Sequence, residues 1–279
     1  MNTTRHEHHD ARETLILGGT GKTGRRVAER LKAGGWPVRI GSRASQPSFD
    51  WTDQSTWDGA LENVRAAYIT YYPDLAVPGA ADAIGAFARM AVAKGVKRLV
   101  LLSGRGEPEA QRAEKMLMAS GADWTILRSS WFCQNFSESF MLDLVLEGTI
   151  ALPVGNVGEP FIDTDDIADT AVAALTDESH AGQLYELTGP RLLTFADVAY
   201  EIRKASGRDV QFVSIPADAF RSALTDQGVP PDIIALMLDL FTQVLDGRNA
   251  HLTDGVRRAL GREPRDFAVY ARNAASAWQ

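Results

Sequence analysis

The sequence predicts an α/β fold in which a doubly wound parallel sheet forms the core and a smaller, mainly helical lobe follows it. Short apolar runs alternate with helical patterns through the first half of the chain, which is typical of parallel sheets covered by helices. A glycine-rich turn joins the first strand to the first helix. The 279 residues, 45% of them hydrophobic, suffice for such a core and a second lobe. We expect a polar tail over 1–13, a core over 14–155 to which 161–188 returns, and the lobe over 189–279.

The composition excludes several classes of protein. With 29 basic and 36 acidic residues, the net charge of −7 disfavours nucleic acid and anionic membranes as partners. No run is long and apolar enough to span a membrane, and the polar N-terminal residues do not resemble a secretory signal. The single cysteine, Cys133, excludes an internal disulfide, so we expect a cytoplasmic protein. The tail residues His6, His8 and His9 are interpreted as solvated side chains in preference to a metal site, and we expect no metal.

The first ordered residues spell a strand, a turn and a helix. Residues 14–17 are apolar and β-prone, and apolar residues then recur at helical spacing at Val27, Ala28 and Leu31. Gly34 and Gly35 end this helix, and a second strand follows over 38–42. The first forty residues therefore predict a βαβ unit.

The turn between the first strand and the first helix is the candidate cofactor-binding segment. Its three spaced glycines let the backbone turn tightly and approach a pyrophosphate, while the helix N-terminus offers free N–H groups. We expect the whole loop to bind the cofactor, through Gly18, Thr20, Gly21, Lys22, Thr23 and Gly24. One alternative is a nucleotide-triphosphate P-loop, which Ile16 opposes because it stands where that motif needs its first glycine. The other alternative is a tight turn without a ligand.

The residues at the end of the second strand indicate which cofactor binds. A carboxylate there favours NAD, because it accepts hydrogen bonds from a ribose hydroxyl. This chain instead has Ser42 and Arg43, and an arginine can pair with the 2′-phosphate of NADP. The sequence therefore favours NADP over NAD, with a solvated loop arginine as the alternative interpretation of Arg43.

The strands that follow bring further side chains to the same edge of the sheet. We predict strands over 64–70, 98–103 and 124–128, with helices over 79–94 and from 108 to about 121. Ligands of such sheets bind at the carboxyl ends of the strands. That rule places two groups beside the cofactor, namely Thr70, Tyr71 and Tyr72 after one strand and Ser103, Gly104 and Arg105 after the next.

The second half of the chain predicts a smaller cover for this core. We expect a short strand over 161–163, with Asp165 and Asp166 capping the helix that follows it. Residues 183–187 predict the last strand of the cofactor sheet. Beyond residue 190 the pattern is mainly helical, including helices over 231–245 and 264–278.

Together these motifs resemble the NmrA-like branch of the atypical short-chain dehydrogenases, which includes NADPH-dependent quinone oxidoreductases and triphenylmethane reductase. The resemblance implies a Rossmann core that binds NADP, with Asp50 and Trp51 at the adenine end, and a C-terminal substrate lobe. Only six residues separate Arg43 from Asp50, fewer than is usual in the family, so we expect a more open adenine side. The segments that carry the resemblance are GGTGKTG (18–24), DWTD (50–53), AEKML (113–117), SGADWTILR (120–128), WFCQNF (131–136), FIDTDDIA (161–168) and GQLYEL (182–187).

The acid of ordinary short-chain dehydrogenases is missing. Their Tyr-x-x-x-Lys motif needs a tyrosine four residues before Lys115, where this chain has Gln111. A second such pair, Tyr200 and Lys204, lies on a lobe helix and is interpreted as a coincidence. Tyr72 and Lys115 are the catalytic candidates that remain, with Tyr71 as an alternative donor. Without a strong acid, we predict hydride transfer to a quinone, an enone or a delocalised cation, which tolerate later protonation by water.

An aromatic segment after the strand 124–128 predicts the substrate pocket. Trp131, Phe132 and Phe136 can stack on a flat acceptor, and Asn135 adds a polar group. The alternative is that these rings pack the junction of the lobes, and Cys133 is interpreted as a small buried residue. Two other functions stay open, namely an NADP-binding sensor that contacts protein partners and a redox-neutral isomerase or epimerase. A homo-oligomer is left open.

Overall fold

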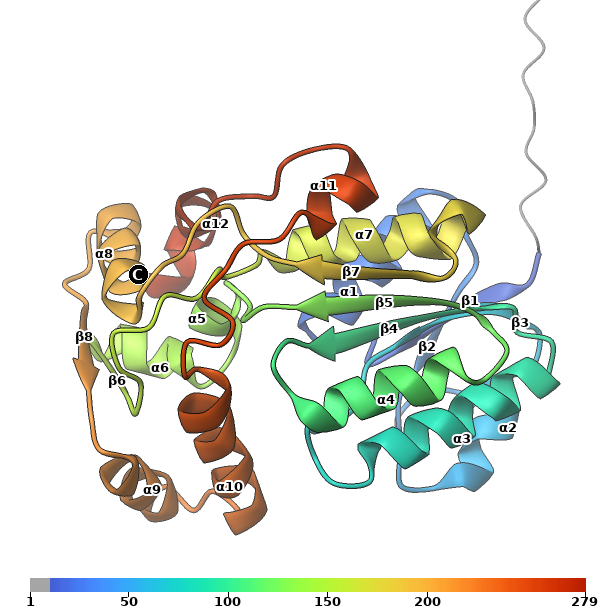
Figure 1. Cartoon of the computed structure of the whole chain (residues 1–279), viewed down its shortest axis with the longest axis horizontal. Helices are drawn as coiled ribbons and strands as arrows, with labels where there is room; N and C mark the ends of the chain where they lie inside the picture. Colours follow the sequence, from blue (N-terminus) through green and yellow to red (C-terminus); the bar gives the residue numbers. More distant parts are fainter. Residues whose placement is uncertain (1–10) are drawn as a thin grey trace, which may run out of the picture.

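A six-stranded, fully parallel sheet forms the core of the chain, as predicted (Figure 1). The computed structural model describes residues 11–279. Strand order across the sheet is β2-β1-β3-β4-β5-β7. The strands are β1 (Glu13–Leu17), β2 (Val38–Gly41), β3 (Val64–Ile69), β4 (Arg98–Gly104), β5 (Asp123–Ser129) and β7 (Gln183–Leu187).

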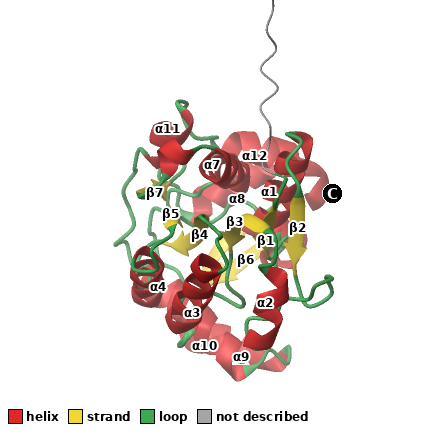
Figure 2. Cartoon of the chain, turned by 90° about the vertical axis from the view of Figure 1, so that its right-hand side faces the viewer, coloured by secondary structure: helices red, strands yellow, loops and turns green. Residues whose placement is uncertain are grey.

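Helices cover both faces of this sheet, because its central strands bury apolar side chains on both sides (Figure 2). One face carries α1 (Lys22–Ala33) and α7 (Thr164–Thr176), which pack against each other. The other face carries α2 (Trp57–Ala60), α3 (Ala80–Ala93) and α4 (Pro108–Met118). The two hydrophobic clusters that result lie above and below the sheet.

The strand order reverses beside β1, and this reversal positions the site. β1 pairs with β2 on one side and with β3 on the other, so connections leave it in opposite directions. In open parallel sheets such a switch point opens a crevice at the carboxyl ends of the strands. The glycine loop after β1 and the residues that follow β3, β4 and β5 therefore meet at one edge.

The second lobe is mainly helical and contains a small parallel pair, β6 (Thr149–Leu152) with β8 (Gln211–Ser214). Cys133 to Val154 share their hydrophobic cluster with the C-terminal region, whereas α11 (Gly255–Leu260) packs back onto α7 and β7. The division into domains at residue 155 stays a prediction. The remaining lobe elements are α5 (Asn135–Glu138), α6 (Met141–Leu146), α8 (Phe195–Ser206), α9 (Ala217–Asp226), α10 (Pro231–Asp239), the π-helical turn Leu240–Val244, α12 (Phe267–Ala274) and the 3-10 turn Ala275–Trp278.

Two local expectations are wrong. The strand expected over 161–163 is only a single bridge between Ile162 and Phe132, because the chain turns into α7 at once. The cap of α7 is Asp163, whose side chain accepts from the N–H of Asp165.

The two neighbouring acids pair with arginines instead of capping. Asp165 pairs with Arg30 of α1, at 2.6 Å. Asp166, fully buried, pairs with Arg262 at 2.7 Å and also with Arg265.

The polar tail expected over 1–13 lies almost entirely outside the described residues. Within residues 11–279, no helix combines the length and the apolar character that crossing a membrane requires.

Candidate cofactor and substrate site

The glycine loop is held in a shape that side chains would disturb. Gly18 has a φ of 66°, which favours glycine, and its carbonyl accepts from the N–H of Gly21 at 2.9 Å. A Cβ on Gly24 would lie 2.8 Å from the carbonyl carbon of Gly18 and 3.0 Å from the Cα of Gly19. The first turn of α1 therefore packs directly against the loop.

This loop fits a pyrophosphate. α1 begins after Gly21 with no side chain capping its N–H groups and no acidic residue in its first turn. Gly18, Thr20 and Gly21 are exposed. The N–H groups of Gly18 and Gly21 already donate to the carbonyls of Gly41 and Gly18, so an anion at this loop would meet the uncapped first turn of α1 and the positive end of its helix dipole. Thr23 and Gly24 are buried and support the turn from beneath.

The loop after β2 offers a positive side chain and no acid. The backbone of Ser42 is fixed by Ser45, whose Oγ accepts from the Ser42 N–H at 3.0 Å and donates to its carbonyl at 2.7 Å. Arg43 follows on the surface. It makes no ion pair or hydrogen bond within residues 11–279, although its charge helps to lower the pKa of the nearby Asp50 carboxyl.

The residues expected at the adenine end occupy a neighbouring turn. The carboxylate of Asp50 accepts from the N–H and hydroxyl of Thr52, which lowers the pKa of Asp50. The indole N–H of Trp51 donates to the carbonyl of Thr70 at 3.0 Å, and its ring lies 4.9 Å from that of Tyr71. The hydroxyl of Thr70 in turn donates to the carbonyl of Leu17 at 3.0 Å, which fixes this corner to the sheet.

A cavity of about 320 Å³ opens at the carboxyl ends of β3, β4 and β5, within the range of small-molecule sites. Lys22 reaches it from the first turn of α1, so the cavity adjoins the glycine loop. Burial lowers the pKa of Lys22. The sequence-predicted residues that line it are Lys22, Thr70, Tyr71, Ser103, Gly104, Arg105, Trp131, Phe132 and Asn135. The other lining residues are Pro73, Asp74, Leu75, Leu102, Glu107, Ser129, Ser130, Glu159, Leu240 and Asn249.

The hydroxyl of Ser103 is committed to a buried ion pair beside the cavity. It donates to Glu114 at 2.6 Å, and the same carboxylate receives the Nε of Arg128 at 2.9 Å. Glu114 is only 2% exposed, so this pair is shielded from solvent. Because its proton is occupied in this way, Ser103 is not a free donor toward a ligand.

Two buried ionisable groups lie near the lobe side of the cavity. Arg105 donates to Ser130 at 3.0 Å and to the carbonyl of Asn249 at 3.2 Å. Glu159 accepts from the N–H of Trp131 at 3.3 Å, and burial raises the pKa of Glu159 to about 7.

Two further carboxyl groups face the cavity from the core. Asp74 follows β3, and Glu107 follows β4 at the start of α4. Burial raises the pKa of each, and for Glu107 the negative charges of Asp74, Asp239 and Glu114 raise it further. The cavity therefore combines aromatic walls with carboxyl groups whose pKa values are raised.

The aromatic segment divides between the cavity and the lobe core. Trp131, Phe132 and Asn135 line the cavity, and the Trp131 ring also packs 4.9 Å from that of Phe241. Phe136 does not line it, which corrects the expectation of a substrate contact. A helix turns by about 100° per residue, so the side chain after Asn135 points into the lobe.

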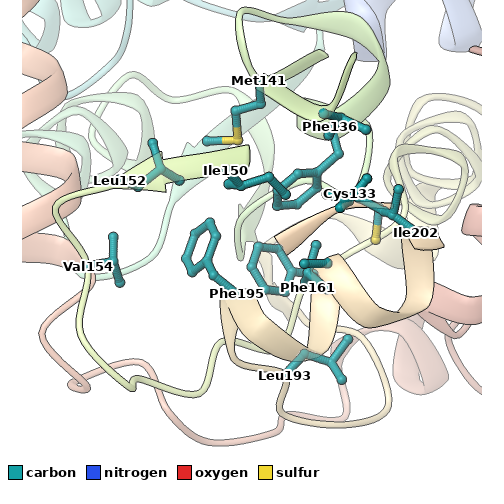
Figure 3. Close-up of a cluster of buried hydrophobic side chains, with 14 of the residues drawn as sticks. Cys133, Phe136, Met141, Ile150, Leu152, Val154, Phe161, Leu193, Phe195 and Ile202 are labelled. Atoms are coloured by element: carbon teal, nitrogen blue, oxygen red, sulfur yellow. The ribbon is translucent and has the colours of Figure 1, made fainter. Parts of the chain in front are cut away.

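Figure 3 shows Phe136 among the buried side chains of the lobe. It is fully buried, and its ring centroid lies 5.7 Å from that of Phe161 and 6.0 Å from that of Phe195. Cys133 lies in the same cluster, and burial raises the pKa of its thiol. This part of the segment holds the lobe together.

Neither catalytic candidate is part of the cavity lining, although the neighbours of Tyr72, Tyr71 and Pro73, are. The side chain of Tyr72 is 75% exposed, and Lys115 is exposed on the outer side of α4. Neither residue lines the cavity, so the geometric basis for a catalytic role is lost. Tyr71 does line it, and burial raises the pKa of Tyr71. Tyr200 is exposed on α8 in the lobe, remote from the sheet.

Sequence reasoning missed several lining residues. Asp74 and Glu107 follow the ends of β3 and β4, so the rule that pointed to Tyr71 and Ser103 also covers them. Glu159, Leu240 and Asn249 arrive from the lobe and carry no local sequence signal, because tertiary packing alone brings them to the cavity.

Comparisons with known proteins span the core and the lobe together. The profile of a family described as NAD(P)H-binding matches residues 18–178. The uncharacterised oxidoreductase YesF of Bacillus subtilis is 34% identical, covering 95% of this chain and 96% of its own. Agroclavine dehydrogenase of Claviceps fusiformis is 32% identical, covering 95% and 98%. The crystal structure of the Citrobacter sp. triphenylmethane reductase with NADP(H) matches at a TM-score of 0.76 and 17% identity, covering 94% and 99%.

Proposed function

The chain belongs to the NAD(P)H-binding, NmrA-like branch of the atypical short-chain dehydrogenases and is an NAD(P)H-dependent oxidoreductase, and from that premise we propose that it transfers hydride from NADPH to a small conjugated or aromatic acceptor. The acceptor classes are quinones, conjugated enones and delocalised cations. The placement of the cavity carries this proposal. It adjoins the glycine loop through Lys22, and Tyr71, Trp131 and Phe132 give it aromatic walls.

The preference for NADPH rests on the loop after β2. Arg43 stands exposed and without an ion-pair partner within residues 11–279, and no carboxylate at the end of β2 competes for a ribose hydroxyl. An arginine binds a phosphate through charge-assisted, often paired hydrogen bonds. The bound nicotinamide supplies the hydride, and the glycine loop, Lys22 and Arg43 hold the phosphates that anchor it.

The residues at the cavity favour acceptors that spread charge. A simple ketone builds up alkoxide charge when it accepts hydride, and it then needs a positioned acid. The usual tyrosine position is Gln111, and the hydroxyl of Ser103 already donates to Glu114. The names of two relatives support an aromatic acceptor, because agroclavine and triphenylmethane dyes are both aromatic compounds.

The direct test follows NADPH absorbance with a benzoquinone, a conjugated enone, a triarylmethane dye and a simple ketone, with NADH run in parallel. We expect turnover of at least one conjugated acceptor with NADPH, slower turnover with NADH and none of the ketone. Tight NADP binding without any turnover supports a sensor instead. Product formation at constant NADPH supports an isomerase or epimerase.

A further inference from the structure

We propose that Glu107 delivers the proton that completes the reduction of a neutral acceptor in this cavity, in place of the absent tyrosine. This step rests on the proposed reductase function. It assigns the donor to a carboxyl group at the start of α4, four residues after Ser103 along the chain.

The side chain of Glu107 is placed to face a ligand. As the N-cap residue of α4 it makes no capping hydrogen bond, and it lines the cavity instead. Its carboxyl group lies against Gly104, where a Cβ would clash with both carboxyl oxygens. Within residues 11–279 the Glu107 carboxyl forms no ion pair and no hydrogen bond. Glu114, seven residues further along α4, is by contrast paired with Arg128 and Ser103.

The charges around Glu107 hold its proton. Burial raises the pKa of Glu107 well above its usual range, and the negative charges of Asp74 in the loop after β3, Asp239 of α10 and Glu114 of α4 raise it further. Lys22 and Arg105 are the cations lining the same cavity. Arg105 directs its guanidinium to Ser130, Asn249 and His251. An uncharged carboxylic acid can donate a hydrogen bond and then a proton.

With an enone as acceptor, the hydride and the proton come from different donors. The C–H bond of the dihydronicotinamide breaks, and its electron pair and hydrogen form a new bond to the β-carbon of the enone. NADPH is thereby oxidised to NADP⁺, and the enone gains two electrons. After hydride transfer the O–H bond of Glu107 breaks and its proton goes to the α-carbon of the enolate, so no acid is required at the carbonyl oxygen while hydride arrives. Water returns a proton to the carboxylate before the next turnover.

The decisive experiment compares an enone with a triarylmethane dye in wild type and Glu107→Gln. The enone needs hydride and a proton, whereas the cationic dye needs hydride alone. General acid catalysis contributes about 10²–10⁴-fold, so we expect the ratio of kcat for the enone to kcat for the dye to fall by about that amount in Glu107→Gln. Glu109→Gln, on the same helix and outside the cavity, serves as the matched control.

Two measurements on the wild type support the comparison. With the enone, kcat should fall at alkaline pH as Glu107 ionises and should show a solvent deuterium isotope effect, and Glu107→Gln should lose both. An unchanged enone kcat in Glu107→Gln, or loss of the isotope effect in Tyr71→Phe instead, overturns the proposal. So does a selective rise in KM for the dye, because Glu107 would then be an ionised cation site. If wild type reduces none of the acceptors, the reductase function itself fails.

Discussion

Gly24 in the first turn of α1 packs against the backbone of Gly18, and a Cβ at Gly24 would lie 2.8 Å from the carbonyl carbon of Gly18. Real Cβ atoms do not approach backbone this closely, so the loop or the helix must move if Gly24 gains a side chain. The same loop leads into the uncapped N-terminus of α1, which fits a pyrophosphate. Both the packing of the loop and the binding of a ligand at its surface therefore depend on Gly24.

We expect Gly24→Ala to weaken NADPH binding at least tenfold and to destabilise the fold by about 1–3 kcal/mol, the usual cost of overpacking. Isothermal titration calorimetry and urea unfolding measure the two effects. Gly59→Ala is the control, because a Cβ there meets only Pro47 at 3.5 Å and alanine favours helix. Unchanged NADPH affinity in a folded Gly24→Ala variant contradicts the assigned phosphate loop.

Arg43→Glu should reverse the preference between the two cofactors. The substitution removes the cation proposed to bind the 2′-phosphate and adds a carboxylate that suits a ribose hydroxyl. A lost charge-assisted bond costs about 1.5–3 kcal/mol, so we expect NADPH to bind at least tenfold more weakly, with NADH unchanged or tighter. Arg89→Glu, at an exposed position of α3, makes the same charge change elsewhere. If both variants weaken NADPH binding equally, the effect of Arg43→Glu comes from the net charge and not from a contact with the 2′-phosphate.

Local sequence patterns were enough to predict the sheet and the glycine loop after its first strand. Strand and helix periodicities, together with the glycines at 18, 21 and 24, depend on neighbours in sequence, and these elements formed as expected. The orientation of single side chains was harder to predict. Asn135 and Phe136 are adjacent, yet one faces the cavity and the other the lobe core, and only the position of the α5 axis decides between them.

The acidic residues of the cavity also show how far local sequence can predict the position of a side chain. Asp74 and Glu107 could have been predicted, because they follow strands of the sheet. Glu159 is separated from that edge by the whole of α5, α6 and β6, and its arrival depends on how the lobe folds back. Its burial, and hence its pKa, is a property of tertiary structure alone.

Phe136→Leu should change stability and leave the substrate site intact. Phe136 contacts other aromatic rings in the lobe and none of the cavity, so we expect a loss of about 1–3 kcal/mol in the free energy of unfolding, as for other core substitutions. KM for the acceptor should stay the same. Phe140→Leu, at a side chain that is 40% exposed, should change stability by less than about 0.5 kcal/mol. A changed KM at unchanged stability restores Phe136 to the substrate site.

Glu159 should make the stability of the ligand-free protein fall as the pH rises. Burial raises its pKa from 4.5 to about 7, so between these values the folded state keeps a proton that the unfolded state releases. Stability therefore decreases across this window, by at most about 1.4 kcal/mol per pH unit, and levels off above pH 7.

Glu159→Gln removes this dependence, because the amide keeps the size of the side chain and can still accept from the N–H of Trp131. Urea unfolding at pH 5, 6, 7 and 8 should show the variant gaining stability relative to wild type as the pH rises. Because wild type and the variant both contain Asp74 and Glu107, the contribution of these two groups to the pH dependence cancels when the proteins are compared. Glu147→Gln, at an exposed position on the lobe, should show no such trend. A relative loss of stability at pH 8 would mean that Glu159 is ionised in the folded state, held by the charge of Arg105.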